Sequence, residues 1–130
     1  MRLRVLVVDD LEDTVELACM LIEMMGHDVR GATSGRQALE VAAQHQAQVV
    51  ICDIGMPDIS GYEVARALRR AQPSAPLHLA AITGWGERAD RVEALAAGFD
   101  QHFLKPTTEA VLRQILDTAA ARVRASPPPP

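Results

Sequence analysis

The residues best suited to chemistry stand at the ends of short apolar runs. Asp9 and Asp10 follow one such run, and Asp53, Thr83 and Lys105 each follow another. Apolar runs of this length, separated by helical stretches, are typical of buried parallel strands. Ligands of such sheets bind outside the carboxyl ends of the strands. The pattern therefore predicts that three acids, a hydroxyl and an ammonium meet at one rim of a sheet, although they are scattered along the chain.

Three carboxylates at that rim favour a metal ion. If the strands before Asp10 and Asp53 are neighbours, the like charges repel one another unless a cation lies among them. Oxygen ligands with open coordination positions favour Mg²⁺, which keeps bound water and accepts a phosphate oxygen. We predict that Asp10, Asp53 and the backbone carbonyl of Gly55 bind Mg²⁺ directly and that Asp9 acts through a water molecule.

The same rim has the groups needed for phosphoryl transfer. A carboxylate can attack phosphorus and form an aspartyl phosphate. Mg²⁺ would neutralise one phosphoryl oxygen, Lys105 a second, and the Thr83 hydroxyl with nearby backbone N–H groups a third. Lys105 is the only lysine among 13 basic residues, and its compact charge suits a single phosphate oxygen. The rim offers no further general base, so we expect the chain to accept a phosphoryl group and hold it.

Four short motifs resemble those of the receiver domain of two-component response regulators. In chain order they are Val7-Val8-Asp9-Asp10, Asp53-Ile54-Gly55-Met56-Pro57, Ile82-Thr83-Gly84 and Leu104-Lys105-Pro106. The resemblance covers about residues 3–124. It implies that Asp53 is the phosphoacceptor and that Asp9 and Asp10 hold Mg²⁺. It also implies that Thr83 is the switch hydroxyl and that Lys105 pairs with a phosphoryl oxygen.

The fold implied by the resemblance is a flavodoxin-like α/β fold. It has a single doubly wound five-stranded parallel sheet in the order 2-1-3-4-5, flanked by five helices. This order would make the first and third strands neighbours, as the acidic cluster requires.

The function implied is that of a phosphoacceptor signalling switch in a two-component phosphorelay. A histidine kinase or a histidine phosphotransfer domain would supply the phosphoryl group. Phosphorylation would then shift a two-state equilibrium over the surface of the fourth helix, fifth strand and fifth helix. The domain would help to catalyse its own phosphorylation and dephosphorylation without turning over an external substrate. A homodimer through the same face is compatible with this function.

Longer stretches around the motifs are similar to receivers fused to hybrid sensor histidine kinases. Two positions depart from the commonest family pattern. Leu11 stands where a polar Asn often follows the acidic pair, and His102 stands where many receivers carry the Tyr or Phe that rotates on activation. The imidazole either makes this switch sensitive to pH or packs as a smaller ring. Trp85 either screens the phosphoryl group from water, docks a partner, or is a plain loop aromatic.

Hydrophobic periodicity predicts alternating strands and helices. Strands are expected at Val5–Val8, His27–Gly31, Gln48–Cys52, Leu77–Ile82 and Gln101–Leu104. Helices are expected at Leu11–Met25, from an N-cap at Ser34 to about Gln44, and at about Tyr62–Ala71, Glu87–Ala97 and Thr108–Arg124. Gly26 and Gly98 are expected to end the first and fourth helices. Alternation of this kind indicates a parallel sheet with helices on both faces.

Length and composition limit the remaining possibilities. At 130 residues the chain fits one domain, which we assign to 1–124, with 125–130 as a Pro-rich tail or the start of a linker. The formal net charge of −4 argues against nucleic-acid binding by this chain. No apolar stretch approaches the ~20 residues that span a bilayer, and no signal peptide is recognisable, so we expect a cytoplasmic location and no membrane contact. Cys19 and Cys52 are expected to be buried free thiols.

Two other classes of protein share some of these features. Aspartyl-phosphate phosphatases of the haloacid-dehalogenase type also use Asp, Thr, Lys and Mg²⁺, but their nucleophile lies on the first strand with a second acid two residues later. A receiver used only as a docking module is disfavoured because the acceptor-site residues are intact. The chain is either a stand-alone regulator or a receiver cut from a longer protein, and its partner kinase and output are not predictable from the sequence.

Overall fold

A single parallel sheet forms the centre of the computed structural model, which describes residues 1–74, 76–84 and 91–125. Its strands are β1 (Arg4–Val8), β2 (Asp28–Ala32), β3 (Val49–Asp53), β4 (His78–Thr83) and β5 (Gln101–Leu104). The strand order is β2-β1-β3-β4-β5, and every neighbouring pair is parallel. The predicted flavodoxin-like order is confirmed.

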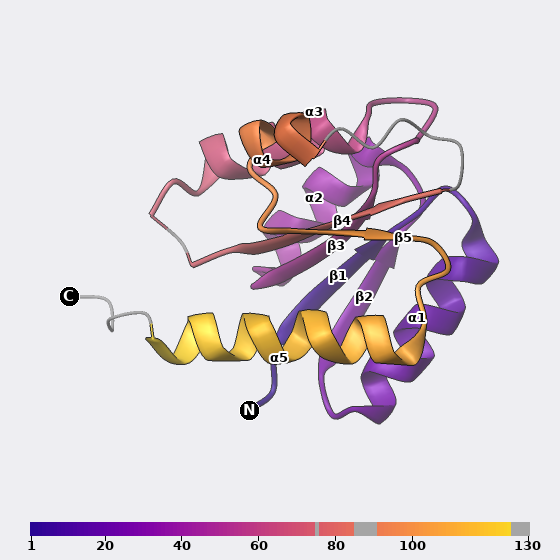
Figure 1. Cartoon of the computed structure of the whole chain (residues 1–130), viewed down its shortest axis with the longest axis vertical. Coiled ribbons are helices and arrows are strands. Elements are labelled where there is room, and N and C mark those ends of the chain that lie inside the picture. The colour runs from indigo at the N-terminus through magenta and orange to yellow at the C-terminus, as the bar shows by residue number, and fades with distance from the viewer. Residues whose placement is uncertain (75, 85–90, 126–130) are drawn as a thin grey trace.

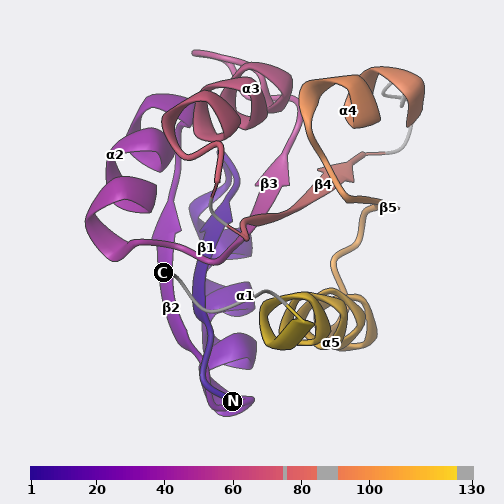
Figure 2. The ribbon, with the colours of Figure 1, turned by 90° about the vertical axis from the view of Figure 1, so that its left-hand side faces the viewer.

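Helices cover both faces of the sheet (Figures 1 and 2). Helices α1 (Glu12–Met24) and α5 (Glu109–Ala125) lie on one face, and α2 (Gly35–His45), α3 (Gly61–Ala71) and α4 (Arg91–Ala97) lie on the other. No helix in the described part of the chain is both long enough and apolar enough to cross a membrane.

The central strands are buried on both faces because alternate residues contribute to two separate cores. In β1, Val5 and Val7 pack in the cluster under α1 and α5, whereas Leu6 and Val8 pack in the cluster under α2, α3 and α4. Every residue of β3 and β4 is buried. Side chains alternate across a strand, so the middle of a strand covered on both faces is apolar, and the buried polar residues His78, Asp53 and Thr83 stand at strand ends. This is why these strands appear in the sequence as continuous apolar runs.

The ends of several helices match their predicted signals. The Ser34 hydroxyl oxygen accepts a hydrogen bond from the Gln37 backbone N–H at 3.2 Å, which caps α2. Gly26 follows α1 with φ of +94°, and Gly98 follows α4 with φ of +113°. These left-handed conformations cost a glycine little, so both residues end their helices as predicted.

Element boundaries differ from the predictions by one or two residues. His27 was predicted to open β2, but its N–H still donates to Ile22 of α1, so β2 begins at Asp28. Both β3 and β4 end one residue later than predicted, because Asp53 pairs in register with Ile82 and Thr83 pairs in register with Leu104. Helix α4 is described from Arg91 to Ala97, and its predicted start at 87 lies outside the described residues. Trp85 and residues 126–130 of the predicted tail also lie outside them, and α5 extends to Ala125.

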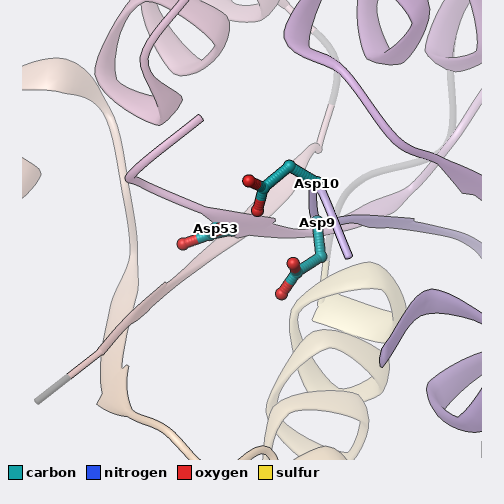
Figure 3. Close-up of side chains that lie close together, drawn as sticks. All are labelled: Asp9, Asp10 and Asp53. Carbon is teal, nitrogen blue, oxygen red and sulfur yellow. The ribbon is translucent and has the colours of Figure 1, made fainter. Parts of the chain in front are cut away.

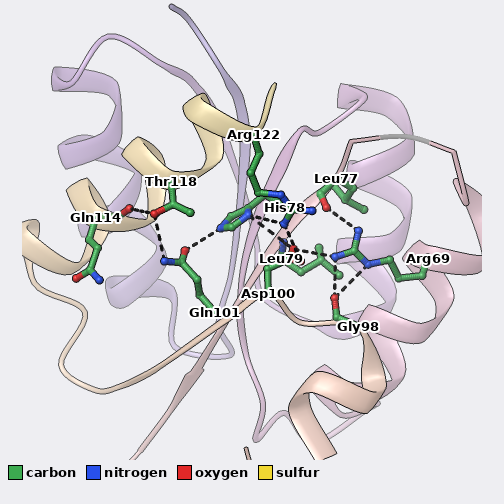
Figure 4. A network of polar contacts seen from close by, with 10 residues as sticks. All are labelled: Arg69, Leu77, His78, Leu79, Gly98, Asp100, Gln101, Gln114, Thr118 and Arg122. Carbon is green, nitrogen blue, oxygen red and sulfur yellow. Dashed lines mark hydrogen bonds and ion pairs between the residues drawn. The ribbon is translucent and has the colours of Figure 1, made fainter. Parts of the chain in front are cut away.

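A polar network joins the elements at the amino end of β4 and β5 (Figure 4). Asp100 pairs with Arg69 of α3 at 2.8 Å and with Arg122 of α5 at 2.6 Å. His78 is buried, and its Nε2 lies 2.7 Å from the side-chain oxygen of Gln101. Burial lowers the pKa of His78 and outweighs the contact with Gln101 and the charge of Asp100, which raise it. The network ties α3, β4, β5 and α5 together at the end of the sheet remote from the predicted site.

Candidate functional site

The three predicted acids meet at the carboxyl end of the sheet. Asp9 and Asp10 follow β1, and Asp53 is the last residue of β3, the strand that pairs with β1. One carboxylate oxygen from each residue lies within 4.8 Å of the others (Figure 3). Asp9 and Asp53 are buried and Asp10 is exposed. The cluster therefore has two acids in the floor of the site and one at its open side.

Lys105 lies between the two buried acids. Its Nζ is 3.3 Å from Asp9 Oδ2 and 3.5 Å from Asp53 Oδ2. Partial burial disfavours the charged ammonium, but the carboxylates of Asp53 and Asp9 outweigh this effect and raise the pKa of Lys105. The register Thr83↔Leu104 between β4 and β5 delivers the lysine to this position, since it directly follows Leu104. In this structure Lys105 neutralises the acids that the sequence grouped with a metal.

The remaining oxygens of the two buried acids are held by the backbone. Asp53 Oδ1 accepts a hydrogen bond from the Gly55 N–H at 3.2 Å, and Asp9 Oδ1 accepts one from the Leu11 N–H at 2.9 Å. Each carboxylate thus has one oxygen facing Lys105 and one fixed by the following turn. Gly55 is exposed beside Asp53, and it places no side chain over the site.

Cys52 is excluded as a second nucleophile, although it adjoins Asp53. It is buried, and burial together with the charges of Asp53 and Asp9 raises the pKa of its thiol. A thiol that stays protonated is a poor nucleophile. Cys19 is only half-buried, contrary to the expectation of a buried thiol, because its position on α1 lies at the margin of the core.

Thr83 and His102 form a hydrogen-bonded pair at the same rim. Thr83 is the buried last residue of β4, and His102 lies half-buried on the neighbouring strand β5. Thr83 Oγ1 and His102 Nε2 are 3.1 Å apart. The structure therefore joins the two residues to which the resemblance assigns the switch. Their direct hydrogen bond could not be predicted from the sequence.

A hollow of about 490 Å³ opens beside the acids. Its polar lining includes Asp9, Asp53 and Lys105, and its apolar wall includes Leu11 and Leu17 of the α1 region. Both leucines are more than half exposed. The Asp53 carboxylate is thus reached from a surface that is polar at its base and apolar at its edge.

The donor set at this rim fits Mg²⁺. All the side-chain donors of the cluster are carboxylate oxygens, and the three residues present them within one ion's reach. A hard cation of this kind takes oxygen ligands and keeps several waters, which suits a cluster with one exposed acid. Asp9, Asp10 and Asp53 are the residues that would hold it, with the carbonyl of Gly55 as the predicted backbone ligand.

One acid of this region was missed by the sequence reasoning. Asp58, in the loop between β3 and α3, accepts hydrogen bonds from the N–H groups of Gly35 and Arg36 at the start of α2, both at 3.0 Å. The sequence signal was an acid within a loop that contains Pro and Gly. Only the fold shows that this loop lies against the amino end of α2.

Comparison with known proteins agrees with this geometry. The model of the response regulator receiver domain matches residues 5–117. The chain belongs to this receiver domain family. Its match includes all five strands except the first residue of β1, together with the rim residues from Asp9 to Lys105.

Relatives of this receiver domain are both sensors and transcriptional regulators. It is 40% identical over 133 residues to the virulence sensor protein BvgS of Bordetella pertussis, covering 98% of this chain and 11% of that protein. It is 35% identical over 122 residues to the transcriptional regulatory protein KdpE of Mycobacterium tuberculosis, covering 94% of this chain and 50% of KdpE. The chain therefore spans half or less of each relative. The higher identity to a sensor protein agrees with the predicted likeness to receivers of sensor kinases.

Solved structures confirm the fold. A response regulator receiver domain protein from Clostridium thermocellum superposes with a TM-score of 0.85 at 26% identity, covering 94% of this chain and 97% of that one. A CheY-like receiver domain protein from Methanospirillum hungatei superposes with a TM-score of 0.86 at 22% identity, covering 97% of this chain and all of the other. The second likeness supports the fold alone.

Proposed function

We propose that this receiver domain accepts a phosphoryl group on Asp53, in a Mg²⁺-dependent reaction, from a phosphohistidine of a histidine kinase or histidine phosphotransfer domain. The observation that carries the proposal is the setting of Asp53. It is a buried carboxylate with two further acids within 4.8 Å and the Lys105 ammonium at 3.5 Å. Phosphoryl transfer needs mainly positioning and neutralisation of charge, and these groups supply both.

In the proposed step, a carboxylate oxygen of Asp53 forms a bond to phosphorus as the bond from phosphorus to the donor imidazole nitrogen breaks. The electron pair of that bond stays on the imidazole, which leaves as the neutral ring or takes up a proton from water. Bound Mg²⁺ would neutralise charge on a phosphoryl oxygen. Lys105 would exchange its contact with Asp53 for a second phosphoryl oxygen, and Gly55 would leave its side of the site open.

Thr83 and His102 are the proposed switch. We assign the tautomer in which the Thr83 hydroxyl donates to His102 Nε2, 3.1 Å away, so the hydroxyl must give up this hydrogen bond in order to donate to a phosphoryl oxygen. Phosphorylation would therefore release the imidazole on β5. A local electrostatic change of this kind biases a two-state element, and the readout would lie on α4, β5 and α5.

Exposed apolar residues support two partner surfaces. On α1, the exposed Leu17, Met20 and Met24 continue the apolar edge of the hollow, and we assign this face to the phosphodonor. On α4 and β5, Leu95 and Leu104 are exposed, and a homodimer through the α4 to α5 face would cover them. The proposal keeps a cytoplasmic location and assigns neither nucleic-acid nor membrane binding to this chain, whose net charge is −4.

Intact-mass spectrometry after incubation with acetyl phosphate and Mg²⁺ tests the proposal. The wild-type protein is expected to gain one phosphoryl group, and omission of Mg²⁺ should abolish the gain. The matched control is Asp53→Asn, which keeps the size of the side chain but removes the nucleophilic carboxylate. A folded wild-type protein without an adduct, or an equal adduct in the variant, would refute Asp53 as the acceptor.

A further inference from the structure

We propose that Asp58 is a positioning residue, which anchors the loop after Asp53 to helix α2 and thereby holds Gly55 ready to bind Mg²⁺. This inference rests on the proposed function, because it concerns the same metal site. The Asp58 carboxylate is hydrogen-bonded to the start of α2 and not to Asp53 or Lys105. Its effect on the site therefore passes through the backbone of the loop.

The contacts of Asp58 reach a separate element. Its Oδ1 accepts from the Gly35 N–H and its Oδ2 from the Arg36 N–H, both at 3.0 Å. The backbone N–H groups of Arg36 and Gly35 lower the pKa of Asp58 to about 2, so the residue is ionised at neutral pH. A carboxylate at the amino end of an 11-residue helix also meets the positive end of the helix dipole. Both oxygens of the loop residue are thereby held by α2.

The loop is pressed against α2 beside this anchor. A Cβ placed on Gly35 would lie 2.3 Å from Cγ1 of Ile59, which follows Asp58. This close approach leaves no room for a side chain at Gly35. The loop is therefore held against α2 both by the Asp58 hydrogen bonds and by the packing of Ile59. The anchor thus fixes the loop in position along the helix, and it does more than cap a helix end.

The far end of the loop is fixed by Gly61. Its N–H donates to the Ile54 carbonyl at 2.9 Å, and a Cβ there would lie 2.6 Å from the Asp53 carbonyl oxygen. Hydrogen bonds within the loop include those from the Gly55 N–H to Asp53 Oδ1 and from the Met56 N–H to the Ile54 carbonyl. Gly55 therefore lies in a short segment of the loop that Asp58 ties to α2.

Loss of that support makes metal binding more costly. A backbone carbonyl that is already ordered binds without a further loss of conformational entropy, whereas a released loop pays this cost on binding. Groups that orient metal ligands typically change metal affinity about 10- to 100-fold. Because Asp58 acts through the backbone, we expect a smaller effect, a loss of about threefold to tenfold in Mg²⁺ affinity for Asp58→Ala.

The matched control is Ser34→Ala. Ser34 caps the same end of α2, because its Oγ accepts from the Gln37 N–H at 3.2 Å, but it has no such bond to the loop. Both variants weaken the cap of α2, and only Asp58→Ala removes hydrogen bonds that join the loop to α2. Asp58→Asn keeps one acceptor oxygen and should recover part of the affinity.

Titration calorimetry with Mg²⁺ and amide hydrogen exchange of Gly55 and Met56 together test the inference. We expect weaker Mg²⁺ binding and faster exchange in Asp58→Ala, and neither change in Ser34→Ala. Equal Mg²⁺ affinity in the two variants, while the wild type binds Mg²⁺, would overturn the inference and leave the proposed function intact. Exchange unchanged in Asp58→Ala would overturn it whatever the metal result. A wild type that binds no Mg²⁺ would instead overturn the metal dependence of the proposed function.

Discussion

Lys105→Met is expected to destabilise the protein and, at the same time, to increase its affinity for Mg²⁺. The substitution keeps most of the apolar stem of Lys105 and removes its charge. Asp9 and Asp53 would then be buried side by side without the ammonium that lies 3.3 and 3.5 Å from them. The same loss of positive charge makes the acidic cluster a stronger site for a divalent cation.

The size of the stability loss follows from the two contacts. Each is worth about 5 kcal/mol of attraction at an effective dielectric constant of about 20. The substitution relieves only the desolvation of the Lys105 ammonium, because Asp9 and Asp53 stay buried, and this relief offsets part of the lost attraction. The Lys105 side chain is 28% exposed, which screens the contacts further. We expect a net loss of about 2 kcal/mol in the free energy of unfolding without Mg²⁺.

The effect of Mg²⁺ is linked to this loss. If the variant binds Mg²⁺ about tenfold more tightly, saturating Mg²⁺ must reduce the stability deficit by about 1.4 kcal/mol. Urea unfolding with and without Mg²⁺ measures the change in stability, and titration calorimetry measures the change in Mg²⁺ affinity, so the two linked quantities can be compared. Arg113→Met is the control, because Arg113 pairs with Glu109 on the exposed face of α5 and its loss should cost about 0.5 kcal/mol or less.

The pH dependence has a definite sign. The carboxylates raise the pKa of Lys105, so its contribution is complete below the unfolded-state pKa of about 10.4 and is lost as pH rises through the folded-state pKa. The deficit of Lys105→Met should therefore be constant through neutral pH and shrink only above about pH 10. A deficit that is unaffected by Mg²⁺, or unaltered Mg²⁺ affinity, would refute the reasoning that Lys105 and the metal neutralise the same acids.

Three further predictions concern the switch, the distal network and the acceptor loop. His102→Phe removes the nitrogen that is hydrogen-bonded to Thr83. Half-maximal phosphorylation should then need about fivefold less acetyl phosphate, equivalent to about 1 kcal/mol. An unchanged titration by intact mass would show that this hydrogen bond does not compete with phosphorylation. Asp100→Asn should cost about 2 kcal/mol in urea unfolding at neutral pH. Burial raises the pKa of Asp100, but a backbone N–H and two guanidinium groups outweigh this effect and lower it. The cost of the substitution should therefore fade as pH drops below about 4. A cost that does not depend on pH would contradict the ion pairs. Gly61→Ala would place a Cβ 2.6 Å from the Asp53 carbonyl oxygen. It should lower the free energy of unfolding by about 3 kcal/mol and slow phosphorylation. Melting like that of the wild type would show that the turn can relax.

Strands and helices were predictable here because each leaves a local signal. The doubly covered sheet requires apolar runs at β3 and β4, and Ser34, Gly26 and Gly98 are residue types with a known preference at helix ends. Boundaries were less predictable. The end of β3 at Asp53 depends on its pairing with Ile82 of β4, a residue far away in the sequence.

Which elements meet could be inferred only through the family's strand order. Once β1 and β3 are neighbours, the acids must lie at one rim, and the structure brings Asp9, Asp10 and Asp53 together there. Motif spacing alone did not require this order, because several sheet topologies accommodate the same alternation of strands and helices.

The sequence by itself determined the chemistry available at the rim, because the identities of its acids, hydroxyl and single lysine do not depend on packing. The tertiary structure alone decided how those groups are paired. Lys105 lies against Asp9 and Asp53, Thr83 bonds His102, and Asp58 reaches across to α2. Each of these pairs joins residues from different elements, so its distance depends on strand register and helix placement, which no local pattern of residues encodes.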